Sequence, residues 1–453
     1  MASRLLNSGN FDIEELNLIN LDTRKSIDIS TIYLEINIFE SIYSSTITGW
    51  ITIADATNLI SGSNALPILG NEIISMIVSV PEHKTYKTET SNKQQNRDSK
   101  KFKYIARIID IKNKNIVNER SMGYEIHFAS EELILDRNIR ISKSYNKTTT
   151  EIIKKIFDNF NYTGSYQFEK TVGNTSVVIP NWTPFRAIKW LTNNRSISGA
   201  YNSPTFFFYQ TLYNSNPGPD EYTISSYDDT ISSKYYFLSL DYLLSYDARK
   251  VIYYRPNFDV DSRDYRSDFK FSNATNYQVL NTFNTLVNNA NGLYNNTLLT
   301  HDIVNKKWKK EIFNYNDYFG KEEHLESYKL YSGNNDVKGN KFDSKEYKES
   351  LLIYNSVGTT DRPSFTEKIS SRRTHRLATL EQFKIRITLP GDCTLESGDV
   401  VYFDLPSPES GGESKFDEYY RGNLLITHIR HIISRSEYTM TIECCKESLS
   451  KEI

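Results

Sequence analysis

Histidine and cysteine are the residue types in this chain that most directly suggest metal or redox chemistry. His428 and His431 lie three residues apart in a strand-like run, so they point to opposite faces and cannot bind one metal ion. His127 alternates out of an apolar stripe and is expected in a structural or solvent-facing role. Cys444 and Cys445 are adjacent on a strand and cannot bond to each other, while Cys393 stands alone. The sequence therefore predicts no metal-binding residue, no disulfide framework, and folding in a reducing compartment.

Carboxylates offer two further kinds of chemistry. The segment Asp259-x-Asp261-x-Arg263-Asp264 begins like a calcium loop, but it has Arg where a third oxygen ligand belongs and lacks the Gly and the closing Glu. Other Asp and Glu residues are plentiful, yet the sequence cannot place two of them across a glycosidic bond. There is no Gly-x-Ser-x-Gly motif and no phosphate-binding Gly loop. We therefore predict no catalytic residue, no cofactor-binding residue and no cofactor.

Three basic clusters remain. Lys306–Lys310 surrounds Trp308, a pattern that suits a nucleic-acid or membrane contact, although acidic residues follow closely and favour a solvated surface. The loop Lys84–Lys103 and the group Arg372-Arg373-x-x-Arg376 are also expected to be solvated. Both flank predicted strands, so in an assembling protein they could be assembly contacts.

The composition bounds the class of protein. The 453 residues suggest two to four domains. The 19 Gly and 12 Pro exclude collagen-like and Gly- or Pro-rich disordered classes, and 13% aromatic residues favour β-structure. The net charge of −2 gives no overall field toward nucleic acid or anionic membrane. No apolar run approaches the ~18 residues of a membrane span, and the first ten residues lack the apolar core of a signal peptide.

Hydrophobic periodicity predicts strands at both ends of the chain and helices between them. A helix is expected after the capping-box pattern Thr148-x-x-Glu151, and a second helix opens at Thr183-Pro184. Residues 213–371 show weak periodicity and predict only mixed short strands, helices and long loops. The predicted strands are 33–39, 46–53, 73–80, 104–111, 124–128, 205–212, 383–389, 399–403, 424–433 and 438–444.

The two β regions share an order of elements. The first contains Leu66-x-x-Leu69-Gly70, a strand, a polar loop and a hairpin, and the second contains Leu395-x-x-Gly398 followed by the same sequence of elements. A Leu before a turn glycine and a β-branched run suits a tight turn into a barrel strand. We interpret this either as a duplicated barrel, with Gly70 and Gly398 at equivalent turns, or as a pattern common to any two all-β domains.

Three segments together resemble the baseplate central-hub proteins of contractile-tailed bacteriophages and their relatives in contractile injection systems. They are Leu69–Val78, then Ile179–Phe185 with the following strand Phe206–Gln210, and then the stretch from Ala378–Phe383 through Leu395-x-x-Gly398 to Tyr438–Cys444. They occur in the family's order and span most of the chain. The middle region, residues 213–371, departs from the family because it is longer than the family minimum.

The resemblance implies a mainly β fold with α+β insertions: two tail-tube-like β-barrels plus one or more inserted peripheral domains. We expect a first barrel at 1–137, an inserted α+β region at 138–371 and a second barrel at 372–453. The inserted region is either wholly peripheral or contributes a part to the second barrel. Three copies would form a ring of six similar units. In such a ring outer strands, such as 424–433, must pair or pack across subunit borders.

The function implied by the resemblance is structural. A homotrimeric hub would connect the hexameric tail tube, or a tube initiator, to the trimeric central spike in the virion baseplate, after assembly in the host cytoplasm. It would leave an axial channel for DNA in transit, with room for contacts to baseplate wedge and tape-measure proteins. The alternatives are an all-β tail adhesin or carbohydrate-binding protein and a glycan-cleaving tail enzyme.

Overall fold

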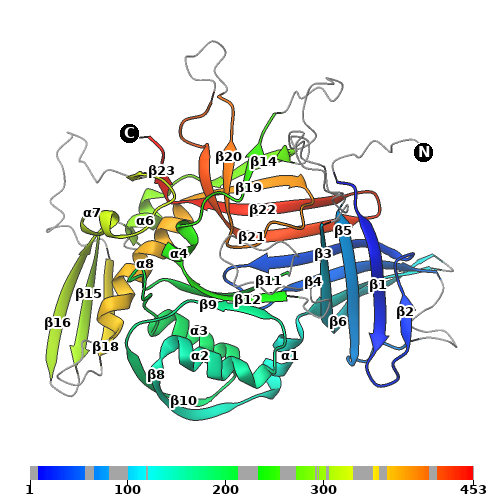
Figure 1. Cartoon of the computed structure of the whole chain (residues 1–453), viewed down its shortest axis with the longest axis horizontal. Coiled ribbons are helices and arrows are strands. Elements are labelled where there is room, and N and C mark those ends of the chain that lie inside the picture. Colours follow the sequence, from blue (N-terminus) through cyan, green and yellow to red (C-terminus); the bar gives the residue numbers. More distant parts are fainter. Residues whose placement is uncertain are drawn as a thin grey trace, which may run out of the picture.

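The chain is built around one large sheet whose strands are antiparallel except for one parallel pair at its branch (Figure 1). The computed structural model describes residues 9–56, 66–80, 100–118, 121–212, 233–255, 272–290, 293, 295–302, 306–329, 350–356, 365–407 and 416–451. The first half of the sheet contains β1 (Asp12–Asn20), β2 (Ser26–Asp28), β3 (Tyr33–Ser41), β4 (Thr48–Asp55), β5 (Glu72–Val80), β6 (Lys100–Asn118) and β7 (Ser121–Ala129). The second half contains β13 (Lys250–Tyr253), β14 (Asn276–Asn281), β19 (Phe383–Pro390), β20 (Val400–Asp404), β21 (Gly422–Ser434) and β22 (Tyr438–Lys446).

The two halves are joined by a pairing between strands almost 400 residues apart. β3 and β21 run antiparallel, from Ser41 opposite His428 to Glu35 opposite Ser434. The sheet has 13 strands, and its main path is β14-β19-β22-β21-β3-β4-β7-β6-β5-β1-β2. The structure confirms the mainly β class with α+β insertions. The two β units are not separate, however, because their described strands together form one open sheet rather than two closed barrels.

The strand 424–433, expected to be an outer strand, is an interior one. β21 pairs with β20, β22 and β3, and the amide of the buried Ile426 donates to the carbonyl of Asp399 at 2.9 Å. The expectation of an edge position is wrong because the register between the halves is set by partners that local periodicity does not reveal. A proline at position 426 would thus break the sheet itself.

Strand alternation produces the core of each half. Along β4, Gly49, Ile51 and Ile53 are buried and the residues between them are partly exposed. The first core also takes in Ile433 and Tyr438 from the second half, so the sheet halves share apolar packing as well as backbone pairing. The second core consists of Ile252, Ala274, Phe383, Ile385, Ile387, Leu389, Leu395, Val401, Phe403, Leu405, Leu424, Ile426, Ile429, Met440, Ile442 and Cys444.

An α+β module follows the first half. The capping box at Thr148 and Glu151 and the Thr183 cap with Pro184 are confirmed. Every residue of the predicted strand from Phe206 to Leu212 is buried, as expected. The elements are α1 (Glu131–Asn138), β8 (Ile141–Thr148), α2 (Thr149–Phe157), η1 (Asp158–Phe160), β9 (Ser165–Phe168), β10 (Asn174–Trp182), α3 (Pro184–Asn194), β11 (Phe206–Leu212) and β12 (Ser233–Ser239).

The remaining elements lie between this module and the second half of the sheet or beside them. A three-stranded sheet, β16-β15-β18, packs against the long helix α8. These elements are α4 (Leu240–Leu244), α6 (Thr285–Ala290), β15 (Asn295–Asp302), β16 (Lys307–Asn314), α7 (Tyr315–Tyr318), η2 (Phe319–Lys321), β17 (Tyr328–Lys329), β18 (Ser350–Ser356), α8 (Phe365–Gln382) and β23 (Ser448–Leu449). None of the described helices combines the length and the hydropathy needed to cross a membrane.

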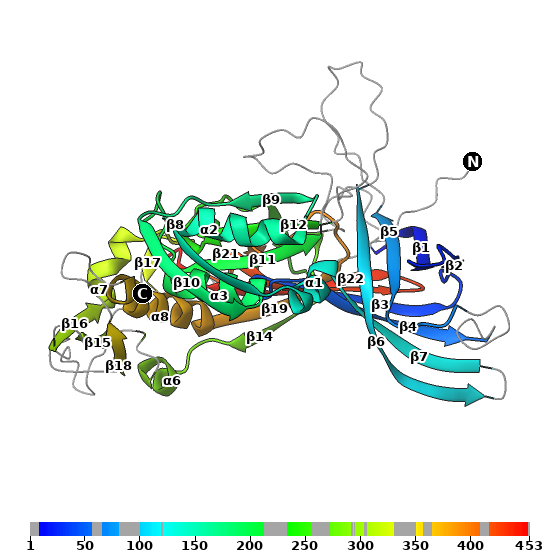
Figure 2. The same cartoon turned by 90° about the horizontal axis from the view of Figure 1, so that it is seen from below.

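β6 is longer than its sequence pattern indicated. Its first part pairs with β5 and its second part with β7, and Figure 2 shows β6 and β7 extending together away from the neighbouring strands. The expected polar loop Lys84–Lys103 is therefore wrong at Lys100–Lys103, which belong to β6, and its other residues lie outside the described ranges. The domain borders at 137/138 and 371/372 stay predictions.

The two repeat glycines share a backbone conformation. Gly70 has φ of 101° and Gly398 has φ of 100°, and each lies two residues before a strand, β5 or β20. Both turns are braced by a nearby carboxylate: Glu72 accepts the amides of Leu69 and Gly70, and Asp399 accepts the amide of Glu396. This local equivalence is what the duplicated-barrel interpretation expects; superposition of the whole units stays a prediction.

Alanine substitutions at the two glycines should differ in cost. Both variants incur the left-handed backbone strain, about 1–2 kcal/mol. At Gly398 the new Cβ would also lie 2.4 Å from the buried Tyr209 hydroxyl, whereas at Gly70 it meets nothing within 4 Å. We expect Gly398→Ala to lower the free energy of unfolding by roughly 1–3 kcal/mol more than Gly70→Ala. Chemical denaturation of the two variants checks this, and equal losses would contradict the packing argument.

Candidate functional site

The arginines of α8 do not face solvent. Their expected solvated position is wrong: the Arg376 side chain is 1% exposed, and Arg373 donates to the side chain of Asn193 and the carbonyl of Phe206 in the α+β module. Burial lowers the pKa of Arg373 to about 10. Arg372 and Arg376 are four residues apart, so a helix brings them to one face, toward the middle of the molecule.

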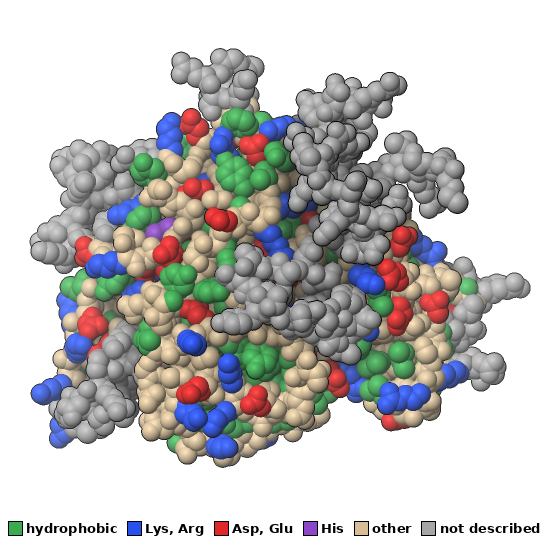
Figure 3. Space-filling view, in the orientation of Figure 1, with side chains coloured by type: hydrophobic (Ala, Val, Ile, Leu, Met, Phe, Trp, Pro, Cys, Tyr) green, Lys and Arg blue, Asp and Glu red, His purple; other side chains and the backbone are tan. Residues whose placement is uncertain are grey.

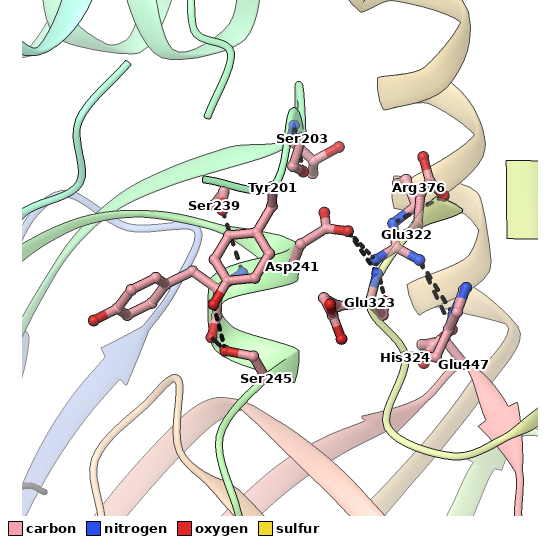
Figure 4. A network of polar contacts seen from close by, with 12 residues as sticks. Tyr201, Ser203, Ser239, Asp241, Ser245, Glu322, Glu323, His324, Arg376 and Glu447 are labelled. Carbon is pink, nitrogen blue, oxygen red and sulfur yellow. Dashed lines mark hydrogen bonds and ion pairs between the residues drawn. The ribbon is translucent and has the colours of Figure 1, made fainter. Parts of the chain in front are cut away.

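Three carboxylates surround Arg376, each from a different element (Figure 4). The guanidinium lies 3.4 Å from Asp241 of α4, 3.6 Å from Glu322 just after η2, and 3.9 Å from Glu447 between β22 and β23. All three acid side chains are 1% exposed. We call this group, together with Arg372 and His324, the Arg376 cluster.

Backbone groups complete the Arg376 cluster. Arg376 donates to the carbonyl of Glu323 at 2.8 Å, and the Glu323 amide donates to Asp241 at 2.9 Å. Arg372 pairs with Glu322 at 3.1 Å and donates to the carbonyl of Asn202 at 2.8 Å. The cluster therefore fixes the segment 322–325 between α4 and α8, and it ties that helix to the α+β module.

His324 and Glu447 form a buried hydrogen-bonded pair. The His324 Nδ1 lies 2.6 Å from Glu447 Oε2 and its Nε2 lies 2.9 Å from the carbonyl oxygen of Phe319. Each ring nitrogen of His324 thus faces one oxygen atom, and the Arg376 guanidinium lies 3.5 Å from Nδ1. Burial alone would raise the pKa of Glu447, but the hydrogen bond and charge of His324 and the charge of Arg376 hold this pKa below its ordinary value.

The Arg376 cluster thus places two arginines and His324 against three carboxylates in the interior. Every acid is engaged by a cation of the same chain, so the arrangement stabilises a junction rather than presenting a free nucleophile or base. The signal that could have located it is the i, i+4 spacing of Arg372 and Arg376; Asp241, Glu322 and Glu447 have no local pattern that pairs them with these arginines.

A second buried polar group lies where β3, β11 and the Gly398 turn meet. Glu40 accepts the amides of Leu212 at 3.1 Å and of Ser397 at 3.4 Å, and it lies 3.4 Å from His431. His431 also contacts the hydroxyl of Tyr438 at 2.7 Å. These contacts hold the α+β module against the line at which the two sheet halves join.

The carboxylate Asp399 stands beside this junction. Arg249 donates to both of its oxygens, at 3.1 and 2.9 Å, and lies 4.0 Å from Glu396. Burial and the neighbouring Glu396 raise the pKa of Asp399 to about 7, against the lowering effect of Arg249. Glu396 in turn accepts from Thr211 and Tyr236 of the α+β module.

The other candidate residues have structural surroundings. His428 is 41% exposed and His431 is 2% exposed, so the prediction that they face opposite sides is confirmed. His127 lies 3.5 Å from Glu125 and packs against Trp50. The three cysteines, Cys393, Cys444 and Cys445, are buried, and none of them forms a disulfide bond.

Of the acidic and basic motifs, only the basic one lies within the described residues. The calcium-like segment Asp259–Asp264 lies outside the described residues. In the Lys306–Lys310 cluster Trp308 is 60% exposed and stacks on His301, and Lys309 pairs with Glu311 and Glu367. Within the described ranges no three His, Cys, Asp or Glu side chains gather so that they could hold a metal ion.

Comparisons with known proteins place the fold among tail proteins. The tail protein from Neisseria meningitidis MC58 matches with a TM-score of 0.51 at 10% identity, over 96% of this chain and 97% of that protein. The 43 kDa tail protein of prophage MuSo2 from Shewanella oneidensis follows with a TM-score of 0.48 at 11% identity, over 96% and 98%. A chain of a Francisella PdpA–VgrG complex matches with a TM-score of 0.45 at 11% identity, over 100% of this chain and 60% of that chain. No family model matches the sequence, and no curated protein is similar to it. The chain therefore shares, over nearly its whole length, the fold of a tail protein.

Removing the central cation of the Arg376 cluster should be costly. Arg376→Met keeps much of the side-chain volume but leaves three buried carboxylates short of one positive charge, which typically costs about 3–5 kcal/mol of folding free energy. The matched control is Arg386→Met in the exposed pair with Glu443, where the side chains are 44% and 29% exposed and a loss under ~1 kcal/mol is expected. Guanidinium denaturation measures both, and similar small losses would show that the cluster is not a major support.

Asp399 should make stability depend on pH near neutrality. Its pKa of about 7 in the folded chain exceeds the ordinary value of about 3.9. The folded state therefore binds a proton that the unfolded state has released, so this contribution is complete below pH ~4 and is lost as the pH rises toward ~7. Thermal melts from pH 4 to 8 should show the wild type losing stability relative to Asp399→Asn across this window. The loss should be on the order of 1.4 kcal/mol for each unit by which the folded pKa exceeds the unfolded pKa. Asp22→Asn, at an exposed turn, should follow the wild-type slope; a constant offset for Asp399→Asn would contradict the assignment.

Proposed function

We propose that this chain is a structural hub protein of a phage tail baseplate. Three copies form a ring that joins the hexameric tail tube to the trimeric central spike, and the ring leaves an axial channel through which DNA passes. Its partners are further copies of itself, the tube protein or tube initiator and the spike, with baseplate wedge and tape-measure proteins as additional neighbours. It acts in the virion after assembly in the host cytoplasm, and it is not an enzyme.

The observation that carries this proposal is the tail-protein fold over 96% of the chain. The three collinear segments that resemble contractile-tail hubs support it independently, because that resemblance rests on sequence and not on the fold. The buried polar groups are consistent with a structural role, since the Arg376 cluster and Glu40 hold elements together and are closed to substrates.

The open sheet supports a protein that assembles. The sheet ends at β14 on one side and at β2 on the other, and neither of these strands has a second partner among the described strands. Unpaired strand edges favour association with another chain. Several large apolar side chains near the β14 end are also exposed: Leu280, Phe283, Leu286 and Val287. A ring of copies would cover such edges.

Stoichiometry tests the proposal. Native mass spectrometry and light scattering of the purified chain should give a mass three times that of the 52.6 kDa subunit. The charge reversal Lys307→Glu with Lys310→Glu, at two exposed positions of β16, should leave that mass unchanged. A well-folded monomer at high concentration would contradict the self-assembling hub. Glycan-array binding by such a monomer would favour the adhesin, and sugar release that is lost on a single Asp or Glu change would favour an enzyme.

A further inference from the structure

Charge is distributed very unevenly along this nearly neutral chain. Residues 138–212, in the α+β module, carry nine Lys and Arg and only three Asp and Glu. Residues 9–80, in the first half of the sheet, carry two Lys and Arg and nine Asp and Glu. Figure 3 shows the same asymmetry on one face: basic side chains gather low on the molecule, where Figure 1 draws α2 and β8, and acidic side chains gather on the right, near β1 and β2.

The basic charges form a compact face on β8 and α2. Lys143 and Lys147 lie on β8 and Lys154 and Lys155 lie on α2, and all four are exposed. The charge of Lys147, with smaller effects of desolvation and of Lys143, lowers the pKa of Lys155, as expected for neighbouring ammonium groups, whereas the Lys154 ammonium lies over the Tyr166 ring at 5.8 Å from its centroid.

The nearest acid does little to balance this face. Glu151 is committed to the capping box of α2, where its carboxylate accepts from the amide and the hydroxyl of Thr148 at 3.2 and 3.1 Å. The same carboxylate also feels Lys147 and Lys155. Glu151 is thus the one carboxylate named beside Lys143, Lys147 and Lys155, and the face keeps an excess of positive charge.

The acidic counterpart is an open strand edge. β2 pairs with Asn17–Ile19 of β1, and the Ile29 amide donates to the carbonyl of Leu16 at 3.0 Å, so β1 from Asp12 to Glu15 has no second partner among the described strands beyond β5. Asp12 and Glu14 are exposed there and Glu15 is partly exposed. Glu14 has a partner of its own, Lys101 at 3.6 Å, in a pair that is 40% and 33% exposed and therefore weak.

The basic face also ends in an open edge. β8 pairs with β10 in a two-stranded sheet, and no other described strand pairs with it. One copy therefore presents an acidic, unpaired edge at β1 and a basic, unpaired edge at β8. Complementary patches at different places on one subunit make head-to-tail contacts, which close into a ring when the rotation allows it.

We propose that the basic face of β8 and α2 binds the acidic edge of β1 in a neighbouring copy of this chain. The inference rests on the proposed trimer and names the surfaces that hold it together. Lysines on β8 and α2 meet Asp12 and Glu15 across the subunit border, and the pairing of opposite charges fixes which edge meets which. Since the groups are at the surface, the attraction weakens within a Debye length of about 8 Å at physiological salt.

Charge reversal tests the inference. Lys147→Glu with Lys155→Glu should weaken the trimer at least about tenfold in its dissociation constant, and Asp12→Lys with Glu15→Lys should do the same. Carrying all four changes on one chain should restore the affinity, because each border again joins opposite charges. The Lys307→Glu, Lys310→Glu chain is the matched control. Sedimentation equilibrium at 50 and 500 mM NaCl gives the constants, and melting temperatures check that each variant folds.

The outcomes separate this inference from the proposed function. A wild type that stays monomeric would overturn the trimer itself and, with it, the named surfaces. Two results would overturn the named surfaces while leaving the hub intact. In the first, the trimer persists in both double variants. In the second, both double variants lose the trimer and the variant with all four substitutions does not regain it. Probes of duplex DNA and of phosphatidylserine vesicles complete the test. Binding to either probe, lost in Lys147→Glu with Lys155→Glu while the trimer is unchanged, would assign the basic face to that partner instead.

Discussion

The pairing of β3 with β21 is the interaction on which the rest of the structure depends. It joins strands from opposite ends of the chain, from Ser41 opposite His428 to Glu35 opposite Ser434, and turns two β units into one sheet. Residues of both halves then share a core, and Glu40 of β3 can reach the α+β module at Leu212 and the Gly398 turn at Ser397. Closing so long a loop costs conformational entropy, which the ladder and the shared apolar burial must offset.

The Arg376 cluster meets a different constraint. Burying an arginine and three carboxylates carries a desolvation penalty that their mutual attraction can fail to exceed, so a buried ion pair is weak evidence for extra stability. What the cluster does provide is specificity: Asp241, Glu322 and Glu447 come from three separate elements, and only one arrangement of α4, α8 and the end of β22 satisfies all of them. In the proposed trimer, such a unique packing would hold the surfaces that meet other subunits in a fixed geometry.

Local signals in the sequence predicted local structure well. The capping box at Thr148, the Thr183-Pro184 helix start and the opposite faces of His428 and His431 depend on residues within a few positions of one another. The φ values of Gly70 and Gly398 likewise follow from each turn alone. Long-range partners were missed. The burial of Arg376 depends on acids more than fifty residues away, and the interior position of Ile426 depends on β3. The hydrophobic periodicity of the sequence near either residue therefore could not reveal these partners.

An electron-microscopy image of the purified protein tests the proposed ring of three chains most directly. Class averages should show a three-fold ring with an opening along its axis, and within each subunit the sheet should run without a break from the first β unit to the second. Averages of single, separate chains, or a closed two-fold dimer without an axial opening, would contradict the hub.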